Sequence, residues 1–142
     1  MKLIKEILCI VMSVILISFI FIGCNYNKHV ENKTFCEIVS EITGTEVTTP
    51  SEAPFGVTIG VDDSYCEIDT NPLNVKDYSS SIILSYIEQM NKKLELPDYL
   101  FNDMIHTSYI QGKQEETFKK IKVKYFYHPN YGLNVSYYRI VR

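Results

Sequence analysis

The C-terminal segment of the chain carries the pattern that constrains the fold most strongly. From Lys120 to Tyr125, lysines alternate with apolar residues, which is the period of a strand buried on one face only. Pro129-Asn130-Tyr131-Gly132 then supplies a turn, with a glycine available for a left-handed position. Apolar residues alternate again from Leu133 to Tyr137. The sequence therefore predicts a β-hairpin formed by residues 120–128 and 132–141.

Other elements must cover the apolar face of this hairpin, because an isolated hairpin is not stable in water. Alternation at residues 56–61 predicts another strand, and residues 65–68 predict a shorter returning strand after a turn. Two helices are expected, one capped by Asp77 or Ser79 and one from Pro97 to Gly112. The sequence thus predicts an α+β fold, a small antiparallel sheet with the C-terminal hairpin and two helices packed on one face.

The helical spacing of apolar residues predicts which side chains these two helices bury. In the first helix they are Ile83, Ile87, Met90 and Leu94, widened by Ile82, Leu84 and Tyr86. In the second they are Leu100, Phe101, Met104, Ile105 and Tyr109.

The N-terminus has the three parts of a secretory signal peptide. Lys2 and Lys5 precede an apolar run from Ile7 to Ile22, and polar sequence follows Cys24 directly. Sixteen helical residues extend only about 24 Å, whereas the hydrocarbon core of a bilayer is roughly 30 Å thick. A cleaved signal peptide over residues 1–23 therefore fits better than a permanent membrane span.

The motif at the end of this run, Phe21-Ile22-Gly23-Cys24, resembles the lipobox of bacterial lipoproteins. Gly23 and Cys24 match its most demanding positions, whereas Phe21 departs from the usual leucine or similar aliphatic residue. The resemblance implies that Cys24 is lipidated and becomes the first residue of the mature protein. An uncleaved anchor and ordinary secretion are the alternatives, and all three place the rest of the chain outside the cytoplasm. The expected location is the cell membrane, where the lipid holds the protein on its outer side.

Residues 24–54 are predicted to be a lipidated N-terminus and flexible tether, and residues 55–142 a single small domain. Within the tether, apolar residues at helical spacing between Phe35 and Ile42 predict a short helix that docks on the domain or is only marginally ordered. Residues 24–70 hold two lysines and nine acidic residues, whereas residues 71–142 hold ten basic and seven acidic residues. The overall acidity argues against a nucleic-acid partner.

Two cysteines, Cys36 and Cys66, remain once the signal peptide and the lipidated cysteine are set aside. Outside the cytoplasm they are candidates for a disulfide, whose loop of about 30 residues would add roughly 3–4 kcal/mol of stability. Two free thiols are the alternative. No C-x-x-C or H-x-x-x-H spacing occurs, and the acidic residues 62–69 lack the EF-hand pattern. No metal and no cofactor is expected.

The candidate partner-binding residues lie in the predicted hairpin: Lys122, Lys124, Tyr127, Tyr131 and Tyr138. Exposed tyrosine beside lysine is typical of surfaces that bind proteins or glycans. An envelope protein or an anionic polymer is the expected partner. The alternative is purely structural, a solvated sheet face with aromatic pairs that stabilise the hairpin.

The sequence contains no G-x-S-x-G, H-E-x-x-H, P-loop or nucleotide-binding glycine pattern. A dyad of Cys66 with His106 or His128 is conceivable, but the sequence predicts no catalytic residues and no enzyme. The predicted function is a membrane-anchored lipoprotein that acts as a non-enzymatic binding module at the bacterial cell envelope. The alternative is a structural or accessory subunit of a larger envelope complex.

The intact mass of the protein purified from membranes tests the lipidation of Cys24. The expected mass corresponds to a chain that begins at Cys24 and carries acyl groups. A Cys24→Ser variant, which lacks the thiol that accepts the lipid, is expected to lose the acyl mass. A wild-type chain that still begins at Met1 would instead establish a helical anchor.

Overall fold

The computed structural model describes residues 33–76 and 79–140. The chain from Thr34 onward forms one compact unit. The predicted signal peptide and Cys24 lie outside the described residues, so the cleavage and the lipidation stay predictions. Within the described ranges, no helix has the length and apolarity that a membrane crossing requires.

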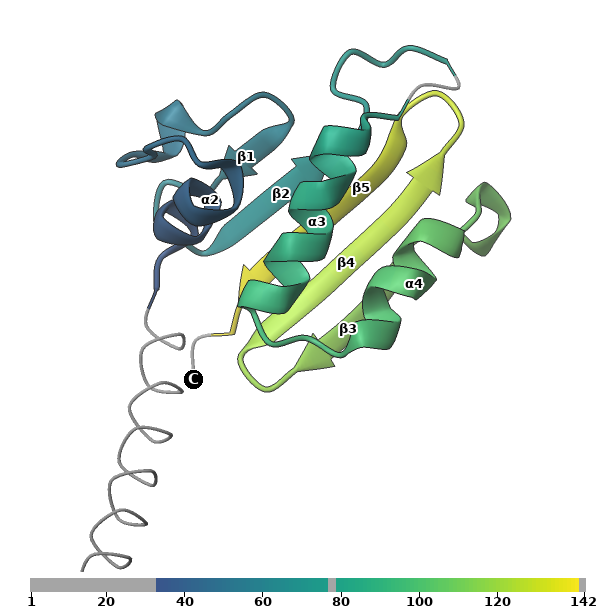
Figure 1. Cartoon of the computed structure of the whole chain (residues 1–142). Helices are drawn as coiled ribbons and strands as arrows, with labels where there is room; N and C mark the ends of the chain where they lie inside the picture. The colour runs from purple at the N-terminus through teal and green to yellow at the C-terminus, as the bar shows by residue number, and fades with distance from the viewer. Residues whose placement is uncertain (1–32, 77–78, 141–142) are drawn as a thin grey trace, which may run out of the picture. The chain divides into compact units, whose positions relative to one another are not determined.

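The domain is built on a five-stranded antiparallel sheet with the order β1-β2-β5-β4-β3 (Figure 1). This confirms the predicted α+β class, and α2 corresponds to the short helix that the sequence predicts between Phe35 and Ile42. The helices are α2 (Phe35–Thr43), α3 (Ser81–Lys93) and α4 (Asp98–His106), with short 3-10 helices η1 (Pro50–Glu52) and η2 (Tyr109–Gln111). The strands are β1 (Val57–Ile59), β2 (Tyr65–Asp69), β3 (Gln114–Phe118), β4 (Ile121–His128) and β5 (Gly132–Arg139).

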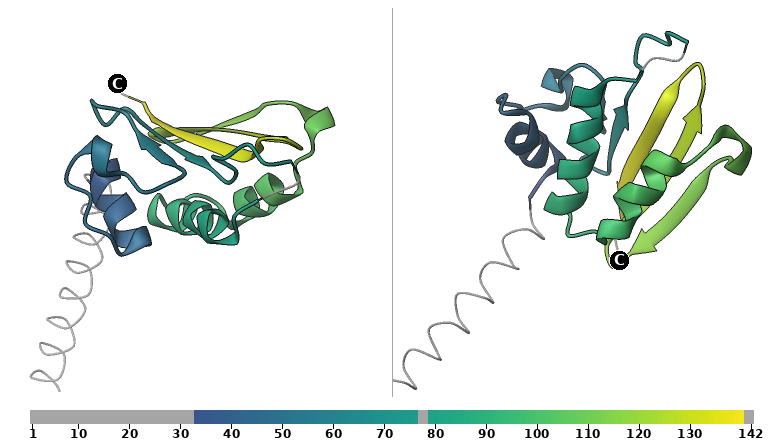
Figure 2. Two further views of the ribbon diagram at one scale, coloured as in Figure 1. Left: turned by 90° about the horizontal axis from the view of Figure 1, so that it is seen from above. Right: turned by 45° about the vertical axis from the view of Figure 1, so that its right-hand side comes forward.

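The three α-helices lie on the same face of the sheet, as the view from above shows (Figure 2, left). The core lies between these two layers, and Ile68, Val123, Val135 and Tyr137 on the central strands are fully buried there. No helix of the described residues covers the other face of the sheet. This one-sided arrangement follows from the alternation in β1, β2, β4 and β5, which places the aliphatic residues of these strands on the helix side.

The predicted hairpin is confirmed, since β4 and β5 pair from Ile121↔Arg139 to His128↔Gly132. Gly132 at the turn has φ +71°, and a Cβ there would lie 2.7 Å from Thr70 Oγ1. Glycine is therefore required for both conformation and space. Strand β3 was not predicted, because Gln-Glu-Glu-Thr-Phe contains a single apolar residue and shows no period-2 pattern.

The folded domain begins at Thr34 rather than near Phe55, so the predicted boundary is wrong by about twenty residues. Helix α2 has both terminal signals: a capping box between Thr34 and Glu37, and Gly44 in the left-handed conformation after its last turn. Its apolar face is part of the core, not a disordered tether. The residues of this segment that the core buries are Phe35, Ile38, Val39, Ile42 and Val47.

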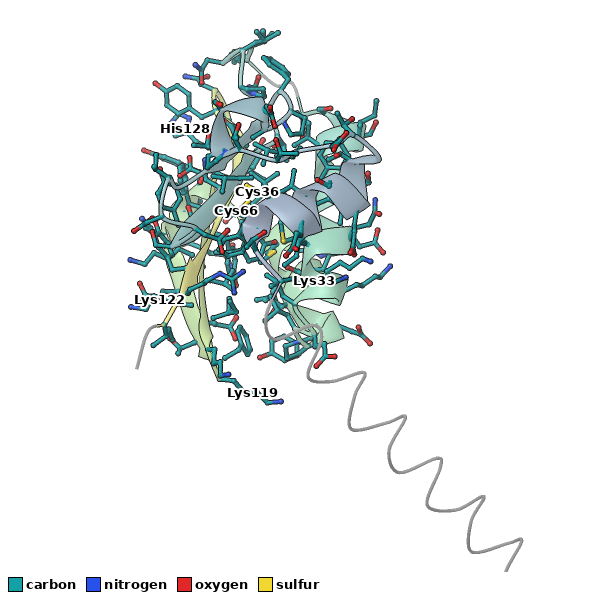
Figure 3. All side chains as sticks on the ribbon, turned by 90° about the vertical axis from the view of Figure 1, so that its left-hand side faces the viewer. Lys33, Cys36, Cys66, Lys119, Lys122 and His128 are labelled. Carbon is teal, nitrogen blue, oxygen red and sulfur yellow. The ribbon has the colours of Figure 1, made fainter. Side chains whose placement is uncertain are left out.

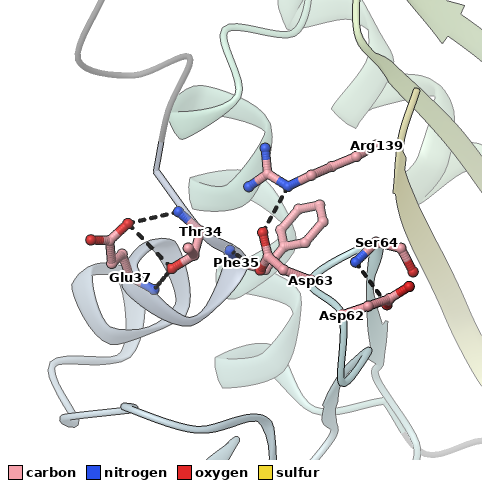
Figure 4. Close-up of polar contacts among 7 residues, drawn as sticks. All are labelled: Thr34, Phe35, Glu37, Asp62, Asp63, Ser64 and Arg139. Carbon is pink, nitrogen blue, oxygen red and sulfur yellow. Dashed lines mark hydrogen bonds and ion pairs between the residues drawn. The ribbon is translucent and has the colours of Figure 1, made fainter. Parts of the chain in front are cut away.

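Asp63, in the turn between β1 and β2, fixes the first turn of α2 (Figure 4). Its Oδ1 accepts the backbone N–H of Phe35 at 2.6 Å, and its Oδ2 accepts Nε–H of Arg139 at 2.9 Å. The Arg139 guanidinium also lies 4.5 Å from the centroid of the Phe35 ring. One carboxylate thus joins the start of α2, the β1–β2 turn and the end of β5.

A buried polar contact joins both other helices to the sheet. The hydroxyl of Tyr137 on β5 donates to Oδ1 of Asn91 on α3 at 2.8 Å. The Asn91 amide in turn donates to Sδ of Met104 on α4 at 3.6 Å. Tyr137 is 0% and Asn91 4% exposed, so water cannot replace either partner.

The predicted helix faces are only partly correct. Ile83, Ile87, Met90, Leu100 and Met104 are buried as expected. The expected burial of the other helix positions is wrong at three exposed residues, Ile82, Ile105 and Tyr109. The second helix ends at His106 instead of continuing to Gly112, which places Tyr109 in η2 and turns it away from the core.

Tyr137→Phe is expected to lower the free energy of unfolding by about 1–3 kcal/mol, because it leaves the buried Asn91 carbonyl oxygen without a donor. Equilibrium urea denaturation measures this loss. Tyr138→Phe removes a hydroxyl from the helix-free face and is expected to change stability by less than about 0.5 kcal/mol. Equal losses in the two variants would contradict a special role for the Tyr137–Asn91 contact.

Candidate functional site

The helix-free side of the sheet is the largest surface that the strands leave outside the core. We refer to it as the open face. Lys122 and His128 both project from this side, away from the helices (Figure 3). By strand, the open face comprises Thr58 on β1; Tyr65, Glu67 and Asp69 on β2; Asn134, Ser136 and Tyr138 on β5; Lys122, Lys124, Phe126 and His128 on β4; and Glu115 and Thr117 on β3.

The two predicted lysines share one carboxylate on this face. Lys122 Nζ and Lys124 Nζ each lie 3.1 Å from an oxygen of Glu115 on β3, which is opposite Lys124 and diagonal to Lys122. Hydrogen bonds from Lys122 and Lys124 lower the pKa of the Glu115 carboxyl below its ordinary value. The pairing reduces the positive charge that the lysines offer, so an anionic polymer is a weaker candidate partner than the sequence suggested.

Aromatic and amide groups on β2 and β5 form the next part of the open face. The rings of Tyr65 and Tyr138 are 6.1 Å apart, and Lys124 Nζ lies 5.4 Å from the Tyr138 centroid. Beside them, Glu67 accepts a hydrogen bond from the Asn134 amide at 2.8 Å and one from Ser136 Oγ at 3.4 Å. The polar groups therefore satisfy one another, and the surface is held in place before any partner arrives.

Three more rings gather where β4 and β5 meet their turn. The centroids of His128 and Tyr131 are 4.6 Å apart with the rings stacked, and Tyr109 lies 4.9 Å from His128 with its ring nearly perpendicular, at 84°. Tyr109 comes from η2, and Tyr131 from the turn itself. We refer to Tyr109, His128 and Tyr131 as the aromatic triad.

The predicted binding residues do not all share one surface. Lys122, Lys124 and Tyr138 lie on the open face, and Tyr131 lies at its end. Tyr127 is on the opposite face, partly buried against the core, so it does not share the open face with the other predicted residues. Residues one apart in a strand point to opposite faces, so alternation from Lys122 and Lys124 leads to Phe126 and His128 instead.

The chain matches no protein-family model, no curated protein and no solved structure. The assignment of a function therefore rests on the geometry of the open face and the aromatic triad.

Cys36 and Cys66 are both free thiols in the structure. Their side chains lie near one another between α2 and the sheet (Figure 3). Burial first, and then the negative charge of Asp63, raise the pKa of both thiols. The disulfide between Cys36 and Cys66 stays a prediction, and it would join α2 to β2.

The conceivable catalytic dyad is not assembled by this fold. Cys66 is completely buried on the helix side of β2, whereas His128 belongs to the open face and His106 is exposed at the end of α4. The raised pKa of the Cys66 thiol also disfavours the thiolate that a nucleophile requires. Among residues 33–76 and 79–140, no three histidine, cysteine, aspartate or glutamate side chains are grouped so that they could hold a metal ion.

A Lys122→Gln/Lys124→Gln variant is expected to raise the pKa of Glu115 toward its ordinary value, because both hydrogen-bond donors lose their charge. An NMR pH titration of the Glu115 carboxyl carbon measures the change. A lowered folded-state pKa stabilises the protein above the unfolded pKa, and this contribution is lost as pH falls through the folded value. Lys92→Gln, which removes a partner of Glu88 instead, is the control. An unchanged Glu115 titration in the double variant would contradict the shared pairing.

Proposed function

We propose that the chain is a lipid-anchored, non-enzymatic binding module at the bacterial cell envelope, with the open face as its contact surface. The observation that carries this proposal is the composition of that face. The solvated side of an antiparallel sheet is ordinarily polar, yet this one holds Tyr65, Phe126, Tyr138 and the aromatic triad among paired charges. Tyrosine-rich surfaces with a polar surround are typical of binding sites.

The distance between the first residue of the domain and the aromatic triad supports the same proposal. The domain begins at Thr34, and Phe35 lies beside Arg139 at one end of β5, through their common partner Asp63. The triad is at the other end of this strand. The eight residues of β5 at roughly 3.4 Å each place its two ends about 24 Å apart. The triad therefore lies about one strand length from Thr34, at the opposite end of the domain from its first residue.

A second candidate function is an accessory subunit of a larger envelope complex, and an apolar hollow favours it. The hollow has a volume of about 260 Å³ and lies beside the start of α3, where Phe55 and Ile82 form part of its lining. Phe55 is 64% and Ile82 65% exposed. A permanent partner would bury these side chains, so this function predicts that the isolated domain self-associates.

Phe126→Thr/Tyr138→Thr is expected to weaken binding of the chain that follows Cys24 to the envelope fraction of its own cells by at least about tenfold. The substitution removes two rings from the open face and keeps residues that suit a strand. Co-sedimentation measures the binding, and circular dichroism verifies the fold.

Ile82→Gln/Tyr99→Gln is the matched control, since it removes two exposed apolar groups from helices α3 and α4. A binding module on the open face predicts unchanged co-sedimentation for this variant and a monomer in sedimentation analysis. Loss of binding in the helix variant, with the strand variant unaffected, would contradict the proposal and favour the accessory subunit.

A further inference from the structure

The aromatic triad is not explained by the packing of the core. Tyr109 is 60% and Tyr131 49% exposed, and His128 is half-buried. The three rings come from two segments about twenty residues apart, yet they form one continuous set of contacts. Exposed rings gathered in this way present apolar faces to solvent, which suits a ligand that stacks on them.

Hydrogen bonds hold the turn of the aromatic triad in place before a ligand binds. The backbone N–H of Asn130 donates to His128 Nδ1 at 3.1 Å. The Asn130 carbonyl accepts the side-chain amide of Asn71 at 3.0 Å, and Asn71 is completely buried. The turn that carries Tyr131 is therefore attached to the interior of the domain. A preformed site loses little conformational entropy on binding.

The hydrogen bond at His128 also fixes what the triad offers a ligand. Because Nδ1 accepts a hydrogen bond, the neutral imidazole carries its hydrogen on Nε2 and can donate there. The tyrosine hydroxyls can both donate and accept. Since His128 covers one face of Tyr131, the exposed part of Tyr131 comprises its opposite face and its edge. The triad thus combines an apolar ring face with polar edges.

The charge of the open face indicates an uncharged ligand. Next to the triad on β4 is Phe126, and beyond it Lys122 and Lys124 share Glu115. The open face also carries the acidic residues Glu67 and Asp69 on β2, so its positive and negative charges are mixed. The electrostatic potential of the open face therefore has no single sign that would complement a polyanion or a polycation.

The shape of the surface indicates a linear ligand. Aromatic rings stand at both ends of the open face, with the triad at one and the Tyr65–Tyr138 pair at the other. Tyr138 lies opposite Lys122, and the six steps along β4 from Lys122 to His128 span about 20 Å. This length exceeds that of a single sugar and suits a short oligosaccharide.

We propose that the aromatic triad and the adjoining open face bind a neutral, extended polysaccharide chain, and this assignment rests on the proposed binding function. A pyranose ring presents C–H groups on its face and hydroxyl groups at its edge. The C–H groups pack against the electron-rich face of Tyr131. The edge hydroxyls exchange hydrogen bonds with His128 Nε2–H and with the amide and carboxylate groups of Asn134 and Glu67.

The test uses the chain that follows Cys24 and a β-1,4-linked tetramer of N-acetylglucosamine, a neutral oligosaccharide, as the probe. Isothermal titration calorimetry is expected to show saturable binding with a Kd of about 1 mM or tighter. Binding is expected to change less than threefold between about 0.05 and 0.5 M salt, because no net charge is neutralised. In ¹H–¹⁵N NMR spectra, the shifted amides are expected at residues 128–134 and 109.

Tyr131→Ala is expected to weaken the tetramer at least tenfold, whereas Tyr131→Phe, which keeps the ring face, is expected to stay within about threefold. Tyr99→Ala removes an exposed tyrosine from α4, outside the open face, and is expected to bind normally. No saturable binding, or equal binding by Tyr131→Ala, would overturn the glycan assignment. Tight, salt-dependent binding of polyphosphate in place of the tetramer would overturn it in favour of an anionic polymer at the lysines.

The glycan assignment and the proposed function fail in different ways. If the tetramer does not bind but Phe126→Thr/Tyr138→Thr still abolishes co-sedimentation with the envelope, the open face binds another envelope component and only the glycan assignment falls. If neither measurement depends on the open face, the proposed function falls together with it.

Discussion

The contacts of Asp63 determine how the domain is closed. The short turn between β1 and β2 holds the Asp63 carboxylate in place. There the carboxylate accepts hydrogen bonds from the first residue of α2 and from Arg139 at the end of β5. Asp63 itself adopts a left-handed conformation, with φ 57°, which aspartate tolerates better than most residues. Arg139 and Asp63 are partly exposed, so the ion pair adds little energy. Its contribution is geometric, because it fixes where α2 begins and therefore which edge of the core the helix covers.

The core and the candidate site depend on the same strands. Each inward residue of β4, such as Val123, alternates with an outward one, such as Lys124. The contact between Tyr137 and Asn91 holds α3 against one side of β5, while Tyr138 extends from the other side. The spacing of the groups on the open face is therefore set by packing that those groups do not touch. A variant that loosens the core is expected to disturb the geometry of the open face even when every residue of that face is unchanged.

The sequence predicts the elements whose patterns are local. The hairpin and the buried positions of α3 follow from periods of 2 and 3.6, and they agree with the structure. Strand β3 has no such period, because its residues are mostly polar and its formation depends on pairing with β4. Because β3 was not predicted, Glu115 was missed as the partner of the two lysines. The aromatic triad could not be predicted either, because Tyr109 reaches His128 only through the early end of α4. Alternation would have indicated His128, but no local signal indicates Tyr109.

The meeting of the first and last described elements at Asp63 has a mechanical consequence. If the protein is anchored by an N-terminal lipid as proposed, a force applied through the preceding segment acts on the domain at Thr34, beside the first turn of α2. Side-chain packing and the bonds of Asp63 resist it, whereas β4 and β5 are joined along their length by a ladder of backbone hydrogen bonds. Under load, α2 is expected to peel from the sheet first. The aromatic triad, at the Gly132 end of β5, would keep its geometry while α2 separates from the domain at the Arg139 end. Detachment of α2 would thus relieve the load before it reaches the paired strands.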